Sequence, residues 1–282
     1  LMSYEKITIV INTFNSDDKI NQCLESINSK VKIIVVENSN NLILKNELEK
    51  KYPNLSCILT GENLGYAKGN NLGLSKVKSE YALILNPDAF LEKETIDRFL
   101  FTAENLNDFA IIGPAKQKEY SNIDAHINQK DIFQVNSLKG FAMFLNIKHF
   151  KEIGFFDQNF FIYLEEIDLC KRLIKANKKI YLDKKLIIHH IGGSSHNEKI
   201  NFEMELSRNW HWMWSTFYFH KKHKGLFLSL LIILPKFISA LLKFLQYMIF
   251  KKTKLKEIYY CRLSGILNSI KGNKSWYRPR LN

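Results

Sequence analysis

The sequence predicts an α/β protein with a mostly parallel sheet that carries helices on both faces, followed by an amphipathic helical extension at the C-terminus. The first hundred residues alternate between short apolar stretches and helical patterns, which is typical of a parallel sheet buried on both faces. The 282 residues, 46% of them hydrophobic, are enough for one large domain with an appendage. Charge and composition change near Ser207, so we expect a body at 1–207 and an extension at 208–282.

Each element of the body follows from a local pattern. Strands are expected at short β-branched or aliphatic runs, which are Ile7–Ile11, Val31–Val36, Leu55–Leu59 and Tyr81–Leu85. Helices are expected where apolar residues recur every three or four positions, which occurs at Ile20–Ile27 behind the acidic cap Asn15–Asp18, at Leu42–Lys50 and at Tyr66–Lys76. The order of these elements predicts a sheet whose strands are connected by helices.

Polar residues follow several of these strands. Ligands of open α/β sheets bind beyond the carboxyl ends of the strands. The polar residues found there are Thr13, Asn15, Glu37, Asn38, Asn86 and Asp88. The acid in Asn-Pro-Asp, after Tyr81–Leu85, is well placed to hold Mg²⁺ or Mn²⁺ on a diphosphate, because these ions prefer oxygen ligands. The same tripeptide is also a common turn, so alone it is a weak signal.

Three further motifs carry residues that suit chemistry or structure. The stretch Gly61–Gly73 combines glycines and asparagines but is neither a dinucleotide fingerprint nor a P-loop. Three acids, Glu165, Glu166 and Asp168, begin an expected helix, where they either favour the helix dipole or include a general base. The pair His189–His190 ends an expected strand, where it either ligates a metal or is structural.

Together and in this order the motifs resemble the family 2 glycosyltransferases of the GT-A fold. The similarity is strongest to the rhamnosyltransferase-like branch that builds bacterial surface polysaccharides. It covers about Ile7 to Ser195 and rests on VVENSN, ENLGYAKGNNLGL, LNPDA and GFFDQNFFIYLEEIDLCKRL, closed by the paired histidines.

The resemblance implies a role for each matching residue. The nucleotide-sugar would contact Thr13, Phe14, Asn15, Glu37, Asn38, Asn63, Gly65, Asn86 and Asp88. Asn86 stands where many relatives have the first acid of Asp-x-Asp, which leaves Asp88 as the metal ligand. Glu37 departs from the Asp that many relatives have at the position that contacts the base.

The catalytic pair of the family maps onto Glu165–Glu166. The implied general base is Glu166, where most relatives have Asp, with Glu165 and Asp168 as substitutes. His189 or His190 would complete the metal site, and the spacing to Gly192 and Ser194 favours His189.

The implied reaction is an inverting sugar transfer that depends on a divalent metal, Mg²⁺ or Mn²⁺. The expected donor is a dTDP- or UDP-linked sugar, with dTDP-rhamnose as the first candidate. The expected acceptor is a lipid-linked oligosaccharide of O-antigen, capsule or related polysaccharide synthesis. Self-association into a homo-oligomer is left open.

The C-terminal extension carries the whole excess of positive charge. From Arg208 onward the chain has 15 Lys or Arg and one acid, Glu257. Its apolar segment Gly225–Phe250 lies between lysine clusters, and Pro235 is expected to kink or divide it. Its polar residues form one narrow helical stripe, consisting of Ser229, Lys236, Ser239, Lys243 and Gln246.

These features predict peripheral attachment to anionic lipid at the cytoplasmic face of the inner membrane. A core helix and a transmembrane span are the alternatives, whereas so much exposed Leu and Ile argues against nucleic acid. The four scattered cysteines predict reduced thiols rather than zinc or disulfides.

Two rival functions are weighed against glycosyl transfer. A methyltransferase also uses an open α/β sheet, but it needs a glycine-rich turn after the first strand, and Thr13–Ser16 has none. A non-catalytic nucleotide-sugar-binding membrane protein would explain Glu166 in place of Asp as a mark of lost activity.

Overall fold

The structure is a computed structural model that describes residues 3–106, 108–115, 131–190 and 200–279. The chain divides into two compact units. The first consists of Leu1–Leu64, Lys68–Phe156 and Glu166–Asn197, and the second of Gly65–Ala67, Asp157–Glu165 and Glu198–Asn282. The boundary expected at Ser207 falls inside a continuous helix, α7 (Asn201–Lys224).

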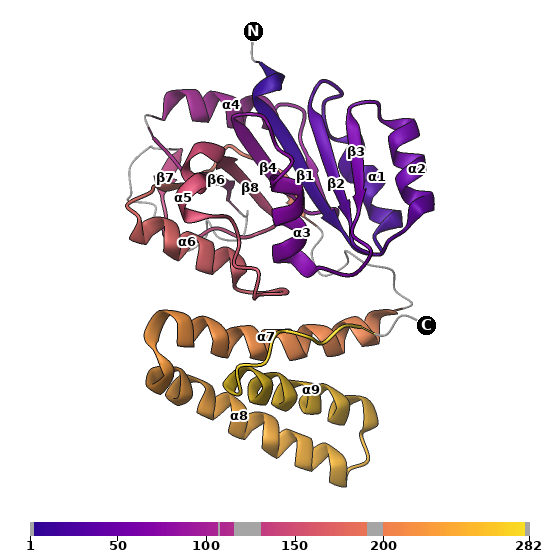
Figure 1. Cartoon of the computed structure of the whole chain (residues 1–282), viewed down its shortest axis with the longest axis vertical. Helices are drawn as coiled ribbons and strands as arrows, with labels where there is room; N and C mark the ends of the chain where they lie inside the picture. Colours follow the sequence, from indigo (N-terminus) through magenta and orange to yellow (C-terminus); the bar gives the residue numbers. More distant parts are fainter. Residues whose placement is uncertain (1–2, 107, 116–130, 191–199, 280–282) are drawn as a thin grey trace. The chain divides into compact units, whose positions relative to one another are not determined.

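The first unit is built on one large sheet with the strand order β3-β2-β1-β4-β8-β6-β9-β7 (Figure 1). Its strands are β1 Ile7–Thr13, β2 Lys32–Glu37, β3 Leu55–Leu59, β4 Tyr81–Leu85, β6 Ile111–Pro114, β7 Ile132–Gln134, β8 Ala142–Asn146 and β9 Ile180–Asp183. Strands β1 to β4 are parallel to one another, and β6 is parallel to β9. Strand β8 runs antiparallel to β4 and β6, and β7 runs antiparallel to β9. The predicted mostly parallel sheet is confirmed.

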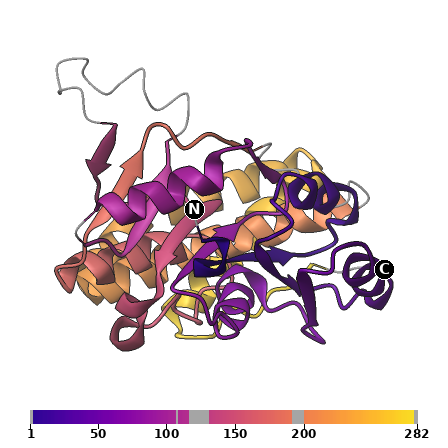
Figure 2. The ribbon, with the colours of Figure 1, turned by 90° about the horizontal axis from the view of Figure 1, so that it is seen from above.

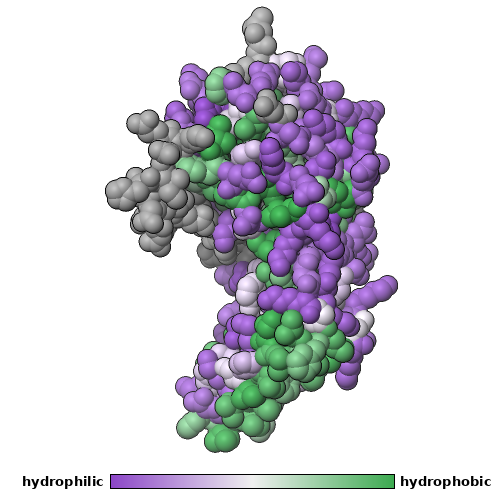
Figure 3. All heavy atoms as spheres, turned by 90° about the vertical axis from the view of Figure 1, so that its left-hand side faces the viewer, coloured by the Kyte–Doolittle hydropathy of each residue, from purple (hydrophilic) through white to green (hydrophobic). Residues whose placement is uncertain are grey.

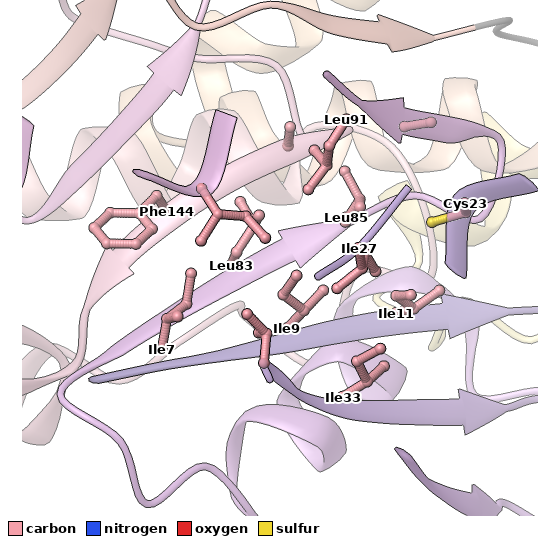
Figure 4. Packing of buried hydrophobic residues seen from close by; sticks show 14 of the residues in the cluster. Ile7, Ile9, Ile11, Cys23, Ile27, Ile33, Leu83, Leu85, Leu91 and Phe144 are labelled. Atoms are coloured by element: carbon pink, nitrogen blue, oxygen red, sulfur yellow. The ribbon is translucent and has the colours of Figure 1, made fainter. Parts of the chain in front are cut away.

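Helices cover both faces of this sheet (Figure 2). They are α1 Asp17–Glu25, α2 Leu42–Lys51, α3 Gly65–Leu74, α4 Thr95–Asn105, α5 Phe150–Ile153 and α6 Glu165–Lys175, with short 3₁₀ turns at η1 Tyr4–Lys6 and η3 Ile147–His149. Ile7, Ile9 and Ile11 share one core with buried residues of α1, α2 and α4 (Figure 4). Val10 points to the other face and packs closely on Gly73 of α3. This alternation follows from the two-residue period of a strand.

The strand order creates a switch point at β1. Chain connections from β1 run through β2 to β3 on one side, whereas β4 pairs with β1 on the other side. Thr13, Glu37 and Leu85 therefore end neighbouring parallel strands at the same edge. Ligands of open α/β sheets bind at this kind of position.

A separate two-stranded ribbon was not expected from the sequence. Strand β5 (Ala89–Leu91) pairs antiparallel with β10 (Ile188–His190), and His190 lies opposite Ala89. A strand ending at the paired histidines was expected, but β5 has only three residues, too few for a period that can be recognised locally, so its pairing with β10 was not.

The second unit contains three long helices, α7, α8 (Leu226–Ile249) and α9 (Thr253–Ile270). Trp210 and Trp214 of α7 pack with Ile258 and Cys261 of α9. After α9 the chain returns along α7 as an extended strap, residues 273–279 (Figure 1). All four cysteines of the chain are free thiols, and all four are buried.

Helix α8 runs continuously through Pro235, so the proline does not divide it. Ser229, Ile233 and Ala240 are its buried residues, and 13 large hydrophobic side chains between Leu226 and Phe250 are exposed. They give the lower part of Figure 3 its broad green area. Among the described residues α8 is one helix long and apolar enough to cross a membrane, by length and composition alone. Such a single helix is weak support for a span.

Candidate functional site

The end of β4 places a buried carboxylate beside an imidazole. The side chain of Asp88 is 1% exposed, and its Oδ1 lies 3.3 Å from His190 Nε2. The amide of Asn86 lies 3.5 Å from the same ring nitrogen, and the ring of Phe141 stacks on His190 at 4.6 Å. The β5–β10 ribbon brings His190 to Asp88, because it pairs His190 with Ala89, the residue directly after Asp88.

The neighbouring histidine belongs to different surroundings. His189 Nε2 lies 2.9 Å from Glu92 Oε1, and its ring stacks on Phe90. Successive residues of a strand point to opposite faces, so only one of the pair can reach Asp88. His190 is therefore the candidate metal ligand of the pair. The sequence spacing that favoured His189 involves Gly192 and Ser194, which lie outside the described residues.

The Asp88–His190 pair has the chemistry of a partial metal site. Asp88 Oδ1 is buried and, apart from its ion pair with His190 when that ring is protonated, accepts no hydrogen bond among the described residues, so the approach of a ligand or ion would be favourable. Within the same residues no group of three or more His, Cys, Asp or Glu could hold a metal. One carboxylate and one imidazole fit Mg²⁺ or Mn²⁺ when diphosphate oxygens and water supply the remaining ligands.

The ends of β1 and β2 are joined by polar contacts. Both carboxylate oxygens of Glu37 accept hydrogen bonds within the turn that follows it, from Ser39 and from the backbone N–H of Asn41. Glu37 is fully buried, and these bonds satisfy its charge locally. The structure thus gives Glu37 a role in shaping the turn in addition to any contact with a base.

Asn38 links three segments at this edge. Its amide donates to Asn12 Oδ1, and its Oδ1 accepts from the backbone N–H of Leu64 at 3.2 Å. Asn15, with a positive φ of 49°, donates its backbone N–H to Ser39 Oγ. The hydroxyl of Thr13 is buried without a partner among the described residues. Thr13, Phe14, Asn15 and Asn38 therefore gather at one edge of the sheet.

Besides Gly73, the glycine-rich stretch packs closely at two further positions. A Cβ on Gly69 would lie 2.5 Å from the Asn12 side chain in the first unit. Gly65 has a φ of 75°, and a Cβ there would lie 2.5 Å from the Phe161 carbonyl oxygen. The next residue, Tyr66, donates its backbone N–H to that oxygen at 2.7 Å. Asn63, two residues before Gly65, is half-buried.

The first turn of α6 carries the predicted catalytic acids in different settings. Asp168 is fully buried and accepts from Arg172 Nε at 2.8 Å. The same guanidinium donates to the carbonyls of Ile153, Gly154 and Phe155. Asp168 therefore anchors the chain that precedes α6. Glu165 is buried and Glu166 is partly exposed, so Glu166 is the more accessible carboxylate.

The turn before α6 belongs to the second unit and is conformationally unusual. Tyr163 and Leu164 both have positive φ, 74° and 68°, a region that costs non-glycine residues about 1–3 kcal/mol. Ser215 of α7 donates to the carbonyl of Ile162 at 2.9 Å, and the ring of Phe161 stacks on His211. These contacts hold the turn in its strained form.

Sequence reasoning missed three residues that shape the site. Asn12 contacts Asn38 across two strand ends, Ser39 binds Glu37, and Arg172 anchors Asp168. Only Arg172 had a local signal, because it stands four residues after Asp168 on a helix.

A mostly parallel sheet with a buried Asp–His pair at its switch point defines an α/β protein with a candidate ligand site at the carboxyl edge. The model of the family described as glycosyl transferase family 2 matches residues 8–170. The chain belongs to this family.

Several characterised proteins share this sequence pattern. The chain is 26% identical over 199 residues to the low-salt glycan biosynthesis hexosyltransferase Agl10 of Haloferax volcanii, covering 62% of this chain and 64% of that protein. It is 27% identical over 248 residues to rhamnosyltransferase WbbL of Escherichia coli, covering 75% and 91%. A Mycobacterium tuberculosis N-acetylglucosaminyl-diphospho-decaprenol L-rhamnosyltransferase is 21% identical over 185 residues, covering 50% and 60%. These relatives agree with the rhamnosyltransferase-like branch.

Solved structures agree on the fold. Mannosyltransferase PcManGT from Pyrobaculum calidifontis, in complex with GDP-Man and Mn²⁺, has a TM-score of 0.60 at 11% identity, covering 95% of this chain and 88% of that one. S. aureus TarS has a TM-score of 0.52 at 15% identity, and the chain spans 38% of its length. The GT-A fold expected from the motifs is thereby confirmed.

Proposed function

We propose that the chain is a glycosyltransferase that transfers a sugar from a nucleotide-sugar donor to an acceptor. The observation that carries the proposal is the buried Asp88 carboxylate facing His190 at the switch point of the sheet. A diphosphate bound at this edge would match the donor position that the resemblance to the family implies. Membership of glycosyl transferase family 2 supports the reaction class.

The donor would be held by the residues at the carboxyl edge. Thr13, Phe14, Asn15 and Asn38 are suited to the nucleoside, since their side chains or backbone gather at the ends of β1 and β2. Asp88 and His190 would hold a divalent metal on the diphosphate. When bound, that ion neutralises charge on the leaving group. Two relatives bear the name rhamnosyltransferase, which favours dTDP-rhamnose over a UDP-sugar.

The chemistry assigned to this chain is one inverting displacement. Glu166 takes the proton of the acceptor hydroxyl as that oxygen attacks the anomeric carbon, and the nucleoside diphosphate leaves from the opposite face. No covalent enzyme intermediate is required. Glu166 is favoured over Asp168 because Asp168 is committed to Arg172.

The acceptor would be a lipid-linked saccharide at the cytoplasmic face of the membrane, in O-antigen, capsule or a related pathway. Successive residues of a helix are about 100° apart around its axis, so the side chains of α8 can be grouped by the side of the helix on which they lie. One side packs through Ile233 and Ala240, one flank carries Lys236 and Lys243, and the other flank is exposed and apolar. A transmembrane helix has no use for a polar flank, whereas a helix lying in the interface needs one.

A panel of nucleotide sugars tests the proposal. We expect one donor to raise the midpoint of thermal unfolding in the presence of Mn²⁺ or Mg²⁺, because a ligand that binds only the folded chain stabilises it. Asp88→Asn and His190→Gln should each weaken the metal dependence of donor binding, whereas His189→Gln should leave it in place. Metal-dependent binding that survives Asp88→Asn in a folded protein would contradict the metal assignment. Failure of every donor to bind would contradict the function.

A further inference from the structure

The second unit contains a cavity of about 390 Å³ that the proposed donor site does not use. It is lined by Asn159, Trp214, Tyr218, Lys221, Lys222, Ser269, Gly272, Asn273 and Lys274. All of these residues belong to the second unit. We call this cavity the lysine pocket.

The floor of the lysine pocket is aromatic and firmly held. The rings of Trp214 and Tyr218 stack with centroids 5.0 Å apart. The indole N–H of Trp214 donates to the Asn273 carbonyl at 3.0 Å, and the Tyr218 hydroxyl donates to Asp157. Because the rings already have polar partners, they present a fixed apolar surface to whatever enters.

The rim of the pocket is cationic. Lys222 pairs with Asp157 at 2.7 Å. Burial raises the pKa of Asp157, but the ion pair with Lys222 and the hydrogen bonds from the Asn159 backbone and the Tyr218 hydroxyl outweigh it, so the pKa lies below its usual value. Lys221 and Lys274 are exposed and form no ion pair within the described part of the chain. Three lysines against one carboxylate leave a positive pocket, which is suited to a doubly charged phosphate or a diphosphate.

The same pocket lies at the start of the apolar surface. Lys221 and Lys222 occupy the last turn of α7, and Gly225, with a φ of 80°, leads directly into α8. The first residues of α8, Leu226 and Phe227, are 53% and 73% exposed. Figure 3 looks onto this corner and shows the apolar surface bordered by hydrophilic residues. A molecule with an anionic head and a long apolar tail matches this neighbourhood.

We propose that the lysine pocket binds the phosphate or diphosphate of an isoprenoid lipid that carries the acceptor sugar. Lys221 and Lys274 are the contacting cations, and Trp214 and Tyr218 support the first apolar unit of the chain. The proposal rests on the proposed function, because it names the part of the acceptor that the enzyme recognises outside the sugar. Nucleotide diphosphates share the anionic chemistry, so the test must separate a lipid from a soluble anion.

The test compares two kinds of vesicle with the full-length protein. Both are neutral phosphatidylcholine, doped either with polyprenyl phosphate or with phosphatidylglycerol at equal surface charge. The unaltered protein should prefer polyprenyl phosphate by about tenfold or more, as expected for charge-assisted hydrogen bonds. Lys221→Gln with Lys274→Gln should abolish that preference. Lys251→Gln with Lys252→Gln removes the same charge at the other end of α8 and should keep the preference.

Three results would overturn the proposal. The unaltered protein could bind both vesicles equally, the Lys251 and Lys252 variant could lose the preference as fully as the pocket variant, or inorganic diphosphate without lipid could bind tightly while the vesicle preference is absent. The last result would assign the pocket to a soluble anion. Donor hydrolysis by the unaltered protein, measured without vesicles, reports on the proposed function separately. Its presence would support glycosyl transfer, whereas failure of every nucleotide sugar to bind would contradict glycosyl transfer and leave the vesicle comparison interpretable.

Discussion

At the scale of single residues, the site separates carboxylates that the sequence presents together. Glu165, Glu166 and Asp168 lie within one helical turn, but Asp168 forms an ion pair with Arg172 and Glu165 is buried. A general base must reach the acceptor hydroxyl, so accessibility distinguishes Glu166 from its neighbours.

Replacing Glu166 by Gln removes the proposed base while keeping its size. We expect turnover to fall by about 10²–10⁴-fold with donor affinity nearly unchanged. Asp168→Asn should instead lower the free energy of unfolding by about 3–5 kcal/mol, because it leaves the Arg172 guanidinium without its buried partner. Steady-state kinetics and chemical unfolding measure the two effects. A fully active Glu166→Gln enzyme, together with an inactive Glu165→Gln enzyme, would move the role to Glu165.

The sequence predicted where several of these polar residues lie because they follow strands. Thr13, Glu37 and Asp88 could be placed at one edge from strand ends alone. His190 could not be distinguished from His189, since that choice depends on which face of a three-residue strand meets β5. The engagement of Glu37 by Ser39 was equally hidden, because it depends on the conformation of the turn after β2.

At the scale of elements, the turn before α6 depends on a glycine in another segment. Gly65→Ala should destabilise the chain by about 1–3 kcal/mol beyond the cost of a left-handed conformation, since its Cβ would meet the Phe161 carbonyl. Gly61→Ala is the matched control, because Gly61 has a φ of 76° and nothing within 4 Å of an added Cβ. It should cost only about 1–2 kcal/mol. Equal losses in urea unfolding would show that Gly65 has no special packing role.

Helix α7 carries a histidine that makes the second unit sensitive to acid. The pKa of His211 is lowered to about 3, mainly because the ring is buried. The hydrogen bond from its Nε2 to the Tyr277 carbonyl raises the pKa, and the positive charge of Arg278 lowers it. An unfolded histidine has a pKa of about 6.5. Between these values the unfolded chain binds more protons than the folded chain. The contribution of His211 to stability is therefore complete above about pH 6.5 and is lost as the pH falls towards 3.

The titration of His211 makes the free energy of unfolding depend on pH, with a slope that can be measured. Lowering the pH from 7.5 to 5 should reduce the free energy of unfolding by about 2 kcal/mol through His211. His211→Gln should remove that part of the slope, because an amide donates to Tyr277 without titrating. His223→Gln changes a half-buried histidine of the same helix and serves as the control. If both variants keep the slope of the unaltered protein, other groups cause it.

At the scale of the whole molecule, charge and apolar surface are concentrated in the same part of the chain. The sequence predicted this concentration correctly, since it depends on composition rather than on packing. It did not predict that α9 and the strap would cover α7. Removing all residues after Lys224 would therefore expose Trp210 and Trp214, so substitutions on α8 are the sounder test of membrane attachment.

We expect the protein to partition onto vesicles that contain anionic lipid and to be partly released by high salt, because each lysine near such a surface contributes about 1 kcal/mol. Leu234→Gln, Ile238→Gln and Leu245→Gln together should lower partitioning by at least about tenfold, since each side chain loses apolar burial. Leu42→Gln and Ile43→Gln alter exposed apolar residues of α2 and are the control. Vesicle sedimentation measures both. Unchanged partitioning of the α8 variant would assign its apolar face to another partner.

The β5–β10 ribbon has a consequence for the order in which the protein is made. Asp88 leaves the ribosome about a hundred residues before His190, which at about 5–20 residues per second is a delay of about 5–20 s. During that interval β5 has no partner strand, and Asp88 at the end of β4 has no imidazole of His190 beside it. The match to the family model also ends at residue 170, before β10 begins. A nascent chain can thus contain the whole matched region and still lack His190 of the proposed metal site.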